Sequence, residues 1–279
     1  MSVPHPSRLS GALSEVERIV ALEAEMTQFN ARRALSAEEK NLELRKLGST
    51  TLLIEPGSPD SNYYNRVIRF GLTDLDLLPE ILDIYERYGI SPCFDMTPDL
   101  QGPEVAEALI SCGFLPWQQL AFLSLDLSGG TRSPNLADEE AGQVELVPVT
   151  KDNVEFFLEL VGRTKGETGV DRGLVARKKG YYCLPEFMNW IARIGGEAAG
   201  ICSLFLRGGE GYLANDYTFP EFRGQGCQSK LIAERIRTAR SLGSTRLYVD
   251  VEFGGTSHDN MLKAGFSTVY VNTFWMRKL

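Results

Sequence analysis

Apolar positions recur at helical spacing near the start of the chain. Between residues 11 and 46 they include Leu13, Val16, Ile19, Val20, Leu22, Met26 and Phe29. This period predicts one amphipathic helix, followed by a second helix at 37–47 that Gly48 ends. Such helices could either cover one face of a sheet or form a surface that binds a partner. We expect them to cover a sheet.

From residue 50 onward, short β-rich runs alternate with helical patterns. Strands are predicted at 50–54, 65–70, 91–96 and 120–127, and helices at 77–87 and 104–111. A polar segment at 128–143, with three glycines and one proline, follows. We interpret residues 131–143 as a linker between two domains.

After this segment the alternation of strands and helices starts again. Strands are predicted at 144–149, 187–194, 198–206, 212–219, 247–251 and 268–276, with a helix at 153–161. A longer helix has apolar residues at 231, 232, 236, 239 and 242, which places Glu234, Arg235, Arg237 and Arg240 on its solvent face. Ser257 is predicted to cap a short helix that ends before Gly265.

The order helix, glycine, strand, helix, Gly-Phe, strand occurs twice. The two glycines are Gly89 and Gly113 in the first half, and Gly243 and Gly265 in the second. Similar order and spacing predict two copies of one αβαβ unit. The expected fold is therefore α/β (α+β), with two domains that each have a mixed, mostly antiparallel central sheet flanked by helices. The predicted domains are 1–130 and 144–279.

Composition narrows the classes of function. The 279 residues are 43% hydrophobic and carry a net charge of −8, so no basic face for nucleic acid is expected. No run approaches the roughly 18 apolar residues of a membrane span, and the start lacks a signal-peptide pattern. Five scattered cysteines and two histidines predict reduced thiols, a cytoplasmic location and no metal site.

One short stretch, F-R-G-Q-G-C-Q-S-K-L at 222–231, has the pattern of an anion-binding loop. Gly224 and Gly226 let the backbone approach a ligand closely, and the following helix offers unpaired amides and a favourable dipole. A dinucleotide motif needs a third glycine where Ser229 stands. A triphosphate loop needs a second glycine and a hydroxyl around Lys230 that are both missing. A glycine-rich turn without a ligand stays open as a third interpretation.

With its flanking elements, this stretch resembles the core of the GNAT superfamily of acyl-CoA-dependent N-acyltransferases. The matching residues run from Tyr212 to Phe266: Y-L-A-N-D-Y-T-F, P-E-F-R-G-Q-G, a long helix, R-L-Y-V-D-V and K-A-G-F. The resemblance implies that backbone amides bind the coenzyme A pyrophosphate. It gives the cofactor-binding residues as Tyr217, Thr218, Phe219, Arg223, Gly224, Gln225, Gly226, Cys227, Gln228 and Ser229. The first half has no counterpart of this loop and is expected to be a degenerate copy.

Three positions depart from the family pattern. Gln228 stands where glycine or alanine is usual, so its side chain must point away from the pyrophosphate. Met261 replaces the tyrosine that often acts as general acid, and Gly254 replaces the asparagine usual after the preceding strand. The sequence therefore predicts a cofactor site without the family's usual proton donor.

Glu210, Asp216 and Tyr217 are the candidate catalytic residues. Glu210 lies thirteen residues before Arg223, the separation at which some family members carry a glutamate base, although a solvated hairpin carboxylate is the alternative. Asp216 has apolar neighbours, so its carboxylate needs either a use or a partner. Tyr217 alternates with Asp216, so only one of them faces the substrate groove.

Other polar residues of this half have simpler interpretations. Tyr212 and Tyr270 are expected in the core, His258 at the surface, and Cys227 as a small loop residue.

The resemblance implies an N-acetyltransferase that moves an acetyl or other short acyl group from acyl-CoA to an amine of a small molecule or peptide. Acetyl-CoA would be the co-substrate, an amine the acceptor, and no metal, nucleic acid or membrane would be involved. One alternative is a catalytically silent CoA-binding or interaction module. Another is an enzyme with a larger donor, a longer acyl-CoA or an aminoacyl-tRNA, although the acidic charge argues against tRNA. The sequence leaves open the acceptor and the choice of monomer or homodimer.

Overall fold

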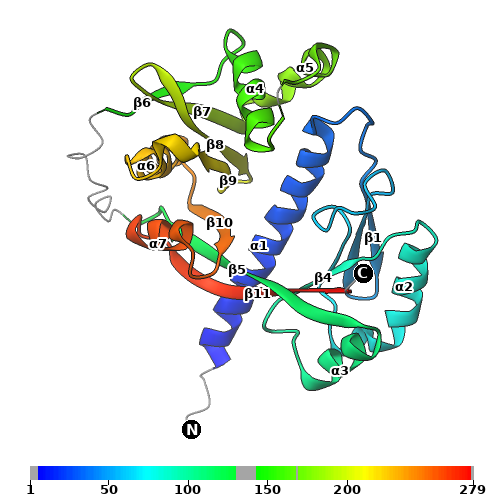
Figure 1. The fold of residues 1–279 in the computed structure, drawn as a ribbon. Helices are drawn as coiled ribbons and strands as arrows, with labels where there is room; N and C mark the ends of the chain where they lie inside the picture. The colour runs from blue at the N-terminus through cyan, green and yellow to red at the C-terminus, as the bar shows by residue number, and fades with distance from the viewer. Residues whose placement is uncertain (1–5, 130–142, 168, 278–279) are drawn as a thin grey trace. The chain divides into compact units, whose positions relative to one another are not determined.

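A computed structural model describes residues 6–129, 143–167 and 169–277, with side chains from residue 11 (Figure 1). The chain divides into two compact units: unit 1 is Met1–Phe122 with Val269–Leu279, and unit 2 is Leu123–Thr268. The predicted fold, a mixed and mostly antiparallel sheet with flanking helices, is confirmed. The predicted linker at 131–143 lies outside the described residues except for Gln143.

Unit 1 contains a sheet in the order β1-β2-β3-β4-β11-β5. Its strands are β1 Glu43–Leu47, β2 Thr50–Ile54, β3 Arg66–Ile68, β4 Cys93–Met96, β5 Phe114–Asp126 and β11 Ser267–Arg277. The pair β3–β4 is parallel, whereas β1–β2, β2–β3 and β4–β11 are antiparallel. Strand β11 enters this unit from the far end of the sequence, so the unit is not a continuous stretch of chain.

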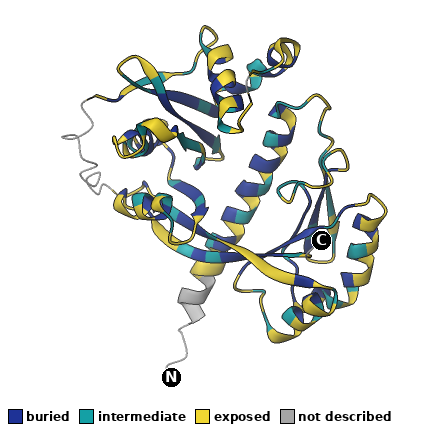
Figure 2. Ribbon diagram, viewed as in Figure 1, coloured by how far each residue is buried: buried dark blue, intermediate teal, exposed yellow. Residues whose placement is uncertain are grey.

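The helices of unit 1 bury apolar faces. They are α1 Pro6–Arg33, the 3-10 helix η1 Leu72–Leu77, α2 Leu78–Glu86 and α3 Pro103–Ser111. Buried residues recur along α1 at Val16, Ile19, Leu22, Met26 and Phe29, as the helical period predicted (Figure 2). Helices α2 and α3 contribute Ile81, Val105 and Leu109 to one core cluster with Phe94 of β4.

A buried ionic cluster ties α1 to the sheet. The Arg66 guanidinium of β3 donates to Glu23 of α1 at 2.7 Å and to Asp95 of β4 at 3.0 Å, and all three side chains are buried. Arg66 also donates to the Thr27 hydroxyl. Because a buried charge is tolerated only when it is paired, these partners fix where α1 lies on unit 1.

The predicted second helix at 37–47 is wrong. Residues 43–47 form β1, which pairs with β2 from Glu43 opposite Ile54 to Leu47 opposite Thr50. Gly48, with φ +62°, makes the tight turn between the two strands instead of ending a helix. The stretch is rich in helix-forming residues, but pairing with the buried strand β2 overrides this weak local preference.

Unit 2 contains the strands β10-β9-β8-β7-β6 in that order. The strands are β6 Glu145–Pro148, β7 Phe187–Ile194, β8 Glu197–Arg207, β9 Glu210–Thr218 and β10 Arg246–Glu252. The helices are α4 Val154–Thr164, α5 Arg172–Lys178, η2 Lys179–Cys183, η3 Pro220–Phe222, α6 Cys227–Ser241 and α7 Thr256–Lys263. Strands β6–β7, β7–β8 and β8–β9 pair antiparallel, and β9–β10 is parallel.

The predicted repeat is present in the order of the elements. The series α2-β4-α3-β5 matches α6-β10-α7-β11. Gly113 follows α3 with φ +83°, and Gly265 follows α7 with φ +94°, so both copies end their short helix in a left-handed conformation that favours glycine. No helix within the described ranges is both long and apolar enough to cross a membrane.

Candidate functional site

Strands β9 and β10 of unit 2 are paired at only one end. Their parallel ladder covers Glu210 to Tyr212 on β9 and Arg246 to Tyr248 on β10. Both strands continue for several residues beyond this ladder. The rest of β9 therefore leaves backbone groups on its β10 side that no β10 residue pairs with, and a ligand can use them.

A β-bulge in β9 lies where the ladder ends. Ser203 of β8 is opposite Ala214, whereas Ile201 is opposite Tyr217, so β9 has one residue more than β8 over this span. Asn215 has φ +52° and donates from Nδ2 to the Ser203 hydroxyl at 2.9 Å. The bulge puts Tyr217 on the same face of the sheet as Glu210, and Asp216 on the opposite face.

Gly200 makes the close approach of β8 to the bulge possible. A Cβ atom at this position would lie 2.7 Å from the Tyr217 carbonyl oxygen and 3.5 Å from Leu231 of α6. Both contacts involve groups that are fixed by the sheet or by helix packing. The absence of a side chain here lets β9 bend while α6 stays packed against the sheet.

The glycine loop connects β9 to α6 in a defined conformation. Gly224 has φ +75° and Gly226 has φ +80°, values that side-chain-bearing residues rarely adopt. Gly226 is the N-cap of α6 and provides no side-chain cap. Arg223 Nε donates to the Thr218 carbonyl at 3.4 Å, and Gln225 Nε2 donates to the Glu221 carbonyl at 3.2 Å. The loop is therefore held by its own side chains.

Helix α6 begins with amides that have no acceptor within the helix. The first four N–H groups of any helix lack an intrahelical partner, and the dipole of this fifteen-residue helix favours negative charge there. No acidic side chain occupies the first turn of α6. The end of the loop is thus a donor-rich, anion-binding backbone of the kind that phosphates use.

The side chain of Gln228 points to α7. Its Nε2 donates to the Ser257 hydroxyl at 3.0 Å, and its Oε1 accepts from Asn260 Nδ2 at 2.6 Å. The unusual residue in the loop therefore joins the start of α6 to α7.

The sequence of this region was compared with models of known protein families. Residues 157–266 match the model of the acetyltransferase (GNAT) family. This part of unit 2 is a GNAT domain. No protein with a curated description matches the sequence.

Several solved structures share the fold of almost the whole chain. A functionally unknown conserved protein from Staphylococcus epidermidis has 13% identity and a TM-score of 0.63, with 85% of this chain and 94% of that chain covered. A GCN5-related N-acetyltransferase from Kribbella flavida has 12% identity and a TM-score of 0.61, with 85% and 90% covered. A tandem GNAT protein from the clavulanic acid biosynthesis pathway has 14% identity and a TM-score of 0.56, with 91% and 93% covered. At such identities the likeness concerns the fold alone.

Helix α4 of the GNAT domain braces the glycine loop. The Arg163 guanidinium lies 4.0 Å from the centre of the Phe219 ring and forms an ion pair with Glu221. Tyr217 meets the same Phe219 ring edge to face, with 5.3 Å between ring centres. Arg163, Phe219 and Tyr217 thus form a contiguous set on the face of the sheet opposite α6. The sequence pattern gave no sign of Arg163.

Asp216 faces α6 and pairs with Arg235. Arg235, predicted to be on the solvent face of the helix, is instead fully buried. It follows Leu231 by four residues and Ile232 by three, so it lies on the apolar face of α6. Burial raises the pKa of Asp216, which the Arg235 charge opposes, and Asp216 Oδ1 has no hydrogen-bond partner among the described residues. The need of Asp216 for a partner was the signal that could have located Arg235.

Glu210 lies at the paired end of β9. It accepts a hydrogen bond from the Tyr248 hydroxyl of β10 at 3.3 Å. The neighbouring Tyr212 is buried and donates to Asp250 of β10 at 2.7 Å. Two tyrosine–carboxylate pairs therefore cross from β9 to β10 where these strands meet.

The residues around α7 correct two sequence predictions. His258 is buried, not at the surface: its Nδ1 accepts from the Gly254 amide at 3.3 Å, and its Nε2 lies 3.2 Å from the Thr268 hydroxyl. Gly255, not Ser257, is the N-cap of α7. The Ser257 hydroxyl is engaged by Gln228 instead.

Met261 and Cys227 are both buried. The position where the family often has a tyrosine is therefore part of the core, and burial raises the pKa of the Cys227 thiol.

In unit 1, the segment between β3 and α2 corresponds to the glycine loop between β9 and α6, but it has a different structure. Residues 69–77 contain no glycine pair, and η1 places Asp74 at this position. The buried Asp74 carboxylate accepts from the Ser49 amide at 3.0 Å and from the Gly71 amide at 3.3 Å. The Asp74 carboxylate thus accepts hydrogen bonds from amides that, in a phosphate-binding loop, would bind the ligand. Its negative charge would also repel a pyrophosphate.

Proposed function

We propose that the GNAT domain of unit 2 transfers an acetyl or other short acyl group from acyl-CoA to an amine of a small molecule or peptide. The observation that carries the proposal is the combination of a one-ended β9–β10 ladder with a donor-rich glycine loop at the start of α6. The opening accommodates an extended chain, and the loop suits the pyrophosphate of coenzyme A.

The pyrophosphate would be held by amides of the loop and of the first turn of α6. Arg223, Gly224, Gln225, Gly226, Cys227, Gln228 and Ser229 contribute backbone to this site. Tyr217, Thr218 and Phe219 would line the acyl-CoA upstream of the loop. A backbone N–H of β9 near the bulge would polarise the thioester carbonyl, and holding both substrates in line would supply much of the rate.

In the reaction, the amine nitrogen bonds to the thioester carbonyl carbon and the carbon–sulfur bond breaks. The amine proton needs a base, and the thiolate takes up a proton as coenzyme A. Glu210 and Tyr217 are the proposed catalytic residues that share one face of β9, with Glu210 as base through water. Asp216, on the other face, supports the bulge through Arg235, and we propose it as a positioning residue rather than a base.

Isothermal titration calorimetry with acetyl-CoA and coenzyme A tests donor binding. Saturable binding is expected, and no binding below millimolar concentration would contradict the proposal. Gly226→Asp should abolish binding, because it adds an anion to the loop and strains a residue with φ +80°. Gly180→Asp is the matched control, since Gly180 is in the same unit with open space around it.

The alternative is a protein that binds CoA without catalysis, which the buried Met261 favours. Thiol release from acetyl-CoA across a panel of amines separates the two functions. Turnover that falls by about 10²–10⁴-fold in Glu210→Gln, with acetyl-CoA affinity retained, supports the transferase. Binding without turnover for every amine supports the silent module.

A further inference from the structure

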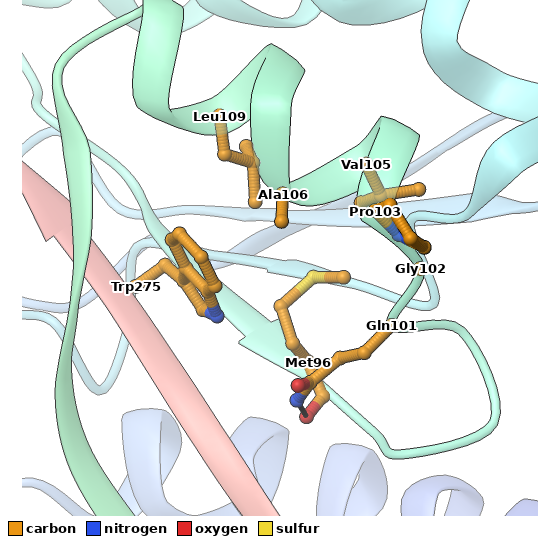
Figure 3. Close-up of a pocket in the computed structure, with 8 residues that line it drawn as sticks. All are labelled: Met96, Gln101, Gly102, Pro103, Val105, Ala106, Leu109 and Trp275. Carbon is orange, nitrogen blue, oxygen red and sulfur yellow. Dashed lines mark hydrogen bonds between the residues drawn. The ribbon is translucent and has the colours of Figure 1, made fainter.

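Unit 1 contains a cavity of about 300 Å³ between its sheet and α3 (Figure 3). Val105, Ala106 and Leu109 form the helix side of this cavity. Met96 at the end of β4 and Trp275 of β11 form the sheet side. The volume is about twice that of an engineered apolar cavity that binds benzene, so it exceeds an ordinary packing defect.

Trp275 gives this cavity a hydrogen-bond donor without a partner. Its side chain is part of the unit 1 core with only 8% of the residue exposed, and its Nε1 has no acceptor among the described residues. In Figure 3 the nitrogen edge of the indole is turned toward Met96 and the interior of the cavity. Buried indole N–H groups usually have a partner, because an unsatisfied donor is costly.

The side-chain nitrogen of the other polar lining residue, Gln101, is already engaged. Gln101 Nε2 donates to the Met96 carbonyl at 2.9 Å, which holds the loop before α3 in place. None of the described residues that line the cavity is ionisable. A charged ligand would lose its hydration without gaining a counter-charge, so the surroundings select an uncharged one.

We propose that this cavity binds a small, uncharged, mainly apolar molecule that carries one hydrogen-bond acceptor. The acceptor oxygen accepts a hydrogen bond from Trp275 Nε1–H, and the apolar body packs against Val105, Ala106 and Leu109. The flexible Met96 side chain adapts to the ligand. This site is separate from the glycine loop of unit 2, so it gives unit 1 a ligand of its own.

A matched pair of probes tests the proposal on the full chain. Acetophenone and α-methylstyrene have nearly the same shape, but only acetophenone has an acceptor oxygen. Calorimetric titration should give acetophenone an affinity about 2- to 10-fold higher, the range that one net hydrogen bond provides. In ¹H–¹⁵N spectra, acetophenone should shift the Trp275 indole cross-peak in a saturable way.

Two variants separate the cavity from other sites. Trp275→Phe keeps an aromatic ring but removes the N–H, so the affinity ratio of the two probes should fall to about one. Ala106→Leu fills the cavity and should abolish binding of both, while Ile110→Ala on the exposed side of α3 should change neither.

The proposal is overturned by an unchanged ratio in Trp275→Phe, by an unperturbed indole cross-peak up to the solubility limit, or by full binding to a folded Ala106→Leu. If Ala106→Leu does not fold, as judged by circular dichroism, the ratio in Trp275→Phe decides alone.

Discussion

Arg235 of α6 and Asp216 of β9 form an ion pair beneath the bulge of the GNAT domain. The arginine is fully buried, whereas about a fifth of the aspartate side chain is exposed. Arg235 also donates from Nε to the Leu231 carbonyl at 3.1 Å. The pair connects the helix that follows the glycine loop to the strand that precedes it.

Removing one partner of this pair should destabilise the protein strongly. Asp216→Ala leaves the Arg235 charge buried without a carboxylate, so we expect the free energy of unfolding to fall by about 3 kcal/mol. Urea denaturation measures the loss. The control is Arg237→Ala on the same helix, whose largely exposed guanidinium pairs with Glu234 and should contribute no more than about 0.5 kcal/mol. Equal effects of the two variants would contradict the importance of the buried pair.

Gly200 should tolerate no side chain. In Gly200→Ala the new Cβ would lie 2.7 Å from the Tyr217 carbonyl oxygen. Because this contact is too short, either β8 or β9 would have to shift. We expect a loss of about 1–3 kcal/mol in urea denaturation. Gly180→Ala, with nothing within 4 Å of its Cβ, should stay within about 0.5 kcal/mol of the parent. A stable Gly200→Ala would mean that β8 and β9 are less closely packed at the bulge than described.

Gln228 should affect stability more than cofactor binding. Gln228→Ala removes two hydrogen bonds between α6 and α7, so the free energy of unfolding should fall by about 1–3 kcal/mol. Because the loop uses backbone amides, the affinity for coenzyme A measured by calorimetry should change less than about threefold. Loss of affinity in a stably folded Gln228→Ala would show that the side chain itself binds the ligand.

Two buried thiols should make the protein less stable in alkali. Burial raises the pKa of Cys93 in unit 1 and of Cys202 in unit 2 to about 12, compared with 9.0 for an ordinary thiol. The folded state thus keeps protons that the unfolded state loses. This stability is fully present below pH 9.0 and is lost as the pH rises through about 12.

Urea denaturation at about pH 8 and about pH 10 measures this loss. Each buried thiol should contribute up to about 1.4 kcal/mol per pH unit above its ordinary pKa. The double variant Cys93→Ala and Cys202→Ala should show a smaller decrease than the parent. An identical decrease in the double variant would contradict the assignment.

Local patterns predicted most strands and helices because each has a clear period and a glycine at its end. The strand at 187–194 agrees at both ends with β7. The predictions failed where contacts with residues distant in sequence determine the secondary structure. Residues 43–47 become a strand through β2, and Trp117 belongs to a β5 that begins at Phe114, six residues earlier than the alternation from Leu120 indicates.

The candidate site was predictable to the extent that it depends on backbone. Gly224 and Gly226 adopt the left-handed conformations that their positions indicated. The partners of polar side chains were not predictable, because Arg163, Arg235 and Tyr248 come from elements that are distant in sequence from the residues they contact. Such contacts depend on sheet order and on the bulge at Asn215, which no local pattern specifies.

The strand β11 also has a consequence for how the protein is made. It pairs with β4 of unit 1, although residues 123–268 separate it from the rest of that unit. During synthesis the ribosome delivers all of unit 2 before the strand that carries Trp275. The sheet of unit 1 therefore stays incomplete until translation has passed residue 277. Until then, one edge of β4 and the surface beneath α3 are uncovered. The unit encoded first is the one completed last, and in that interval it is the part most exposed to chaperones and to misassembly.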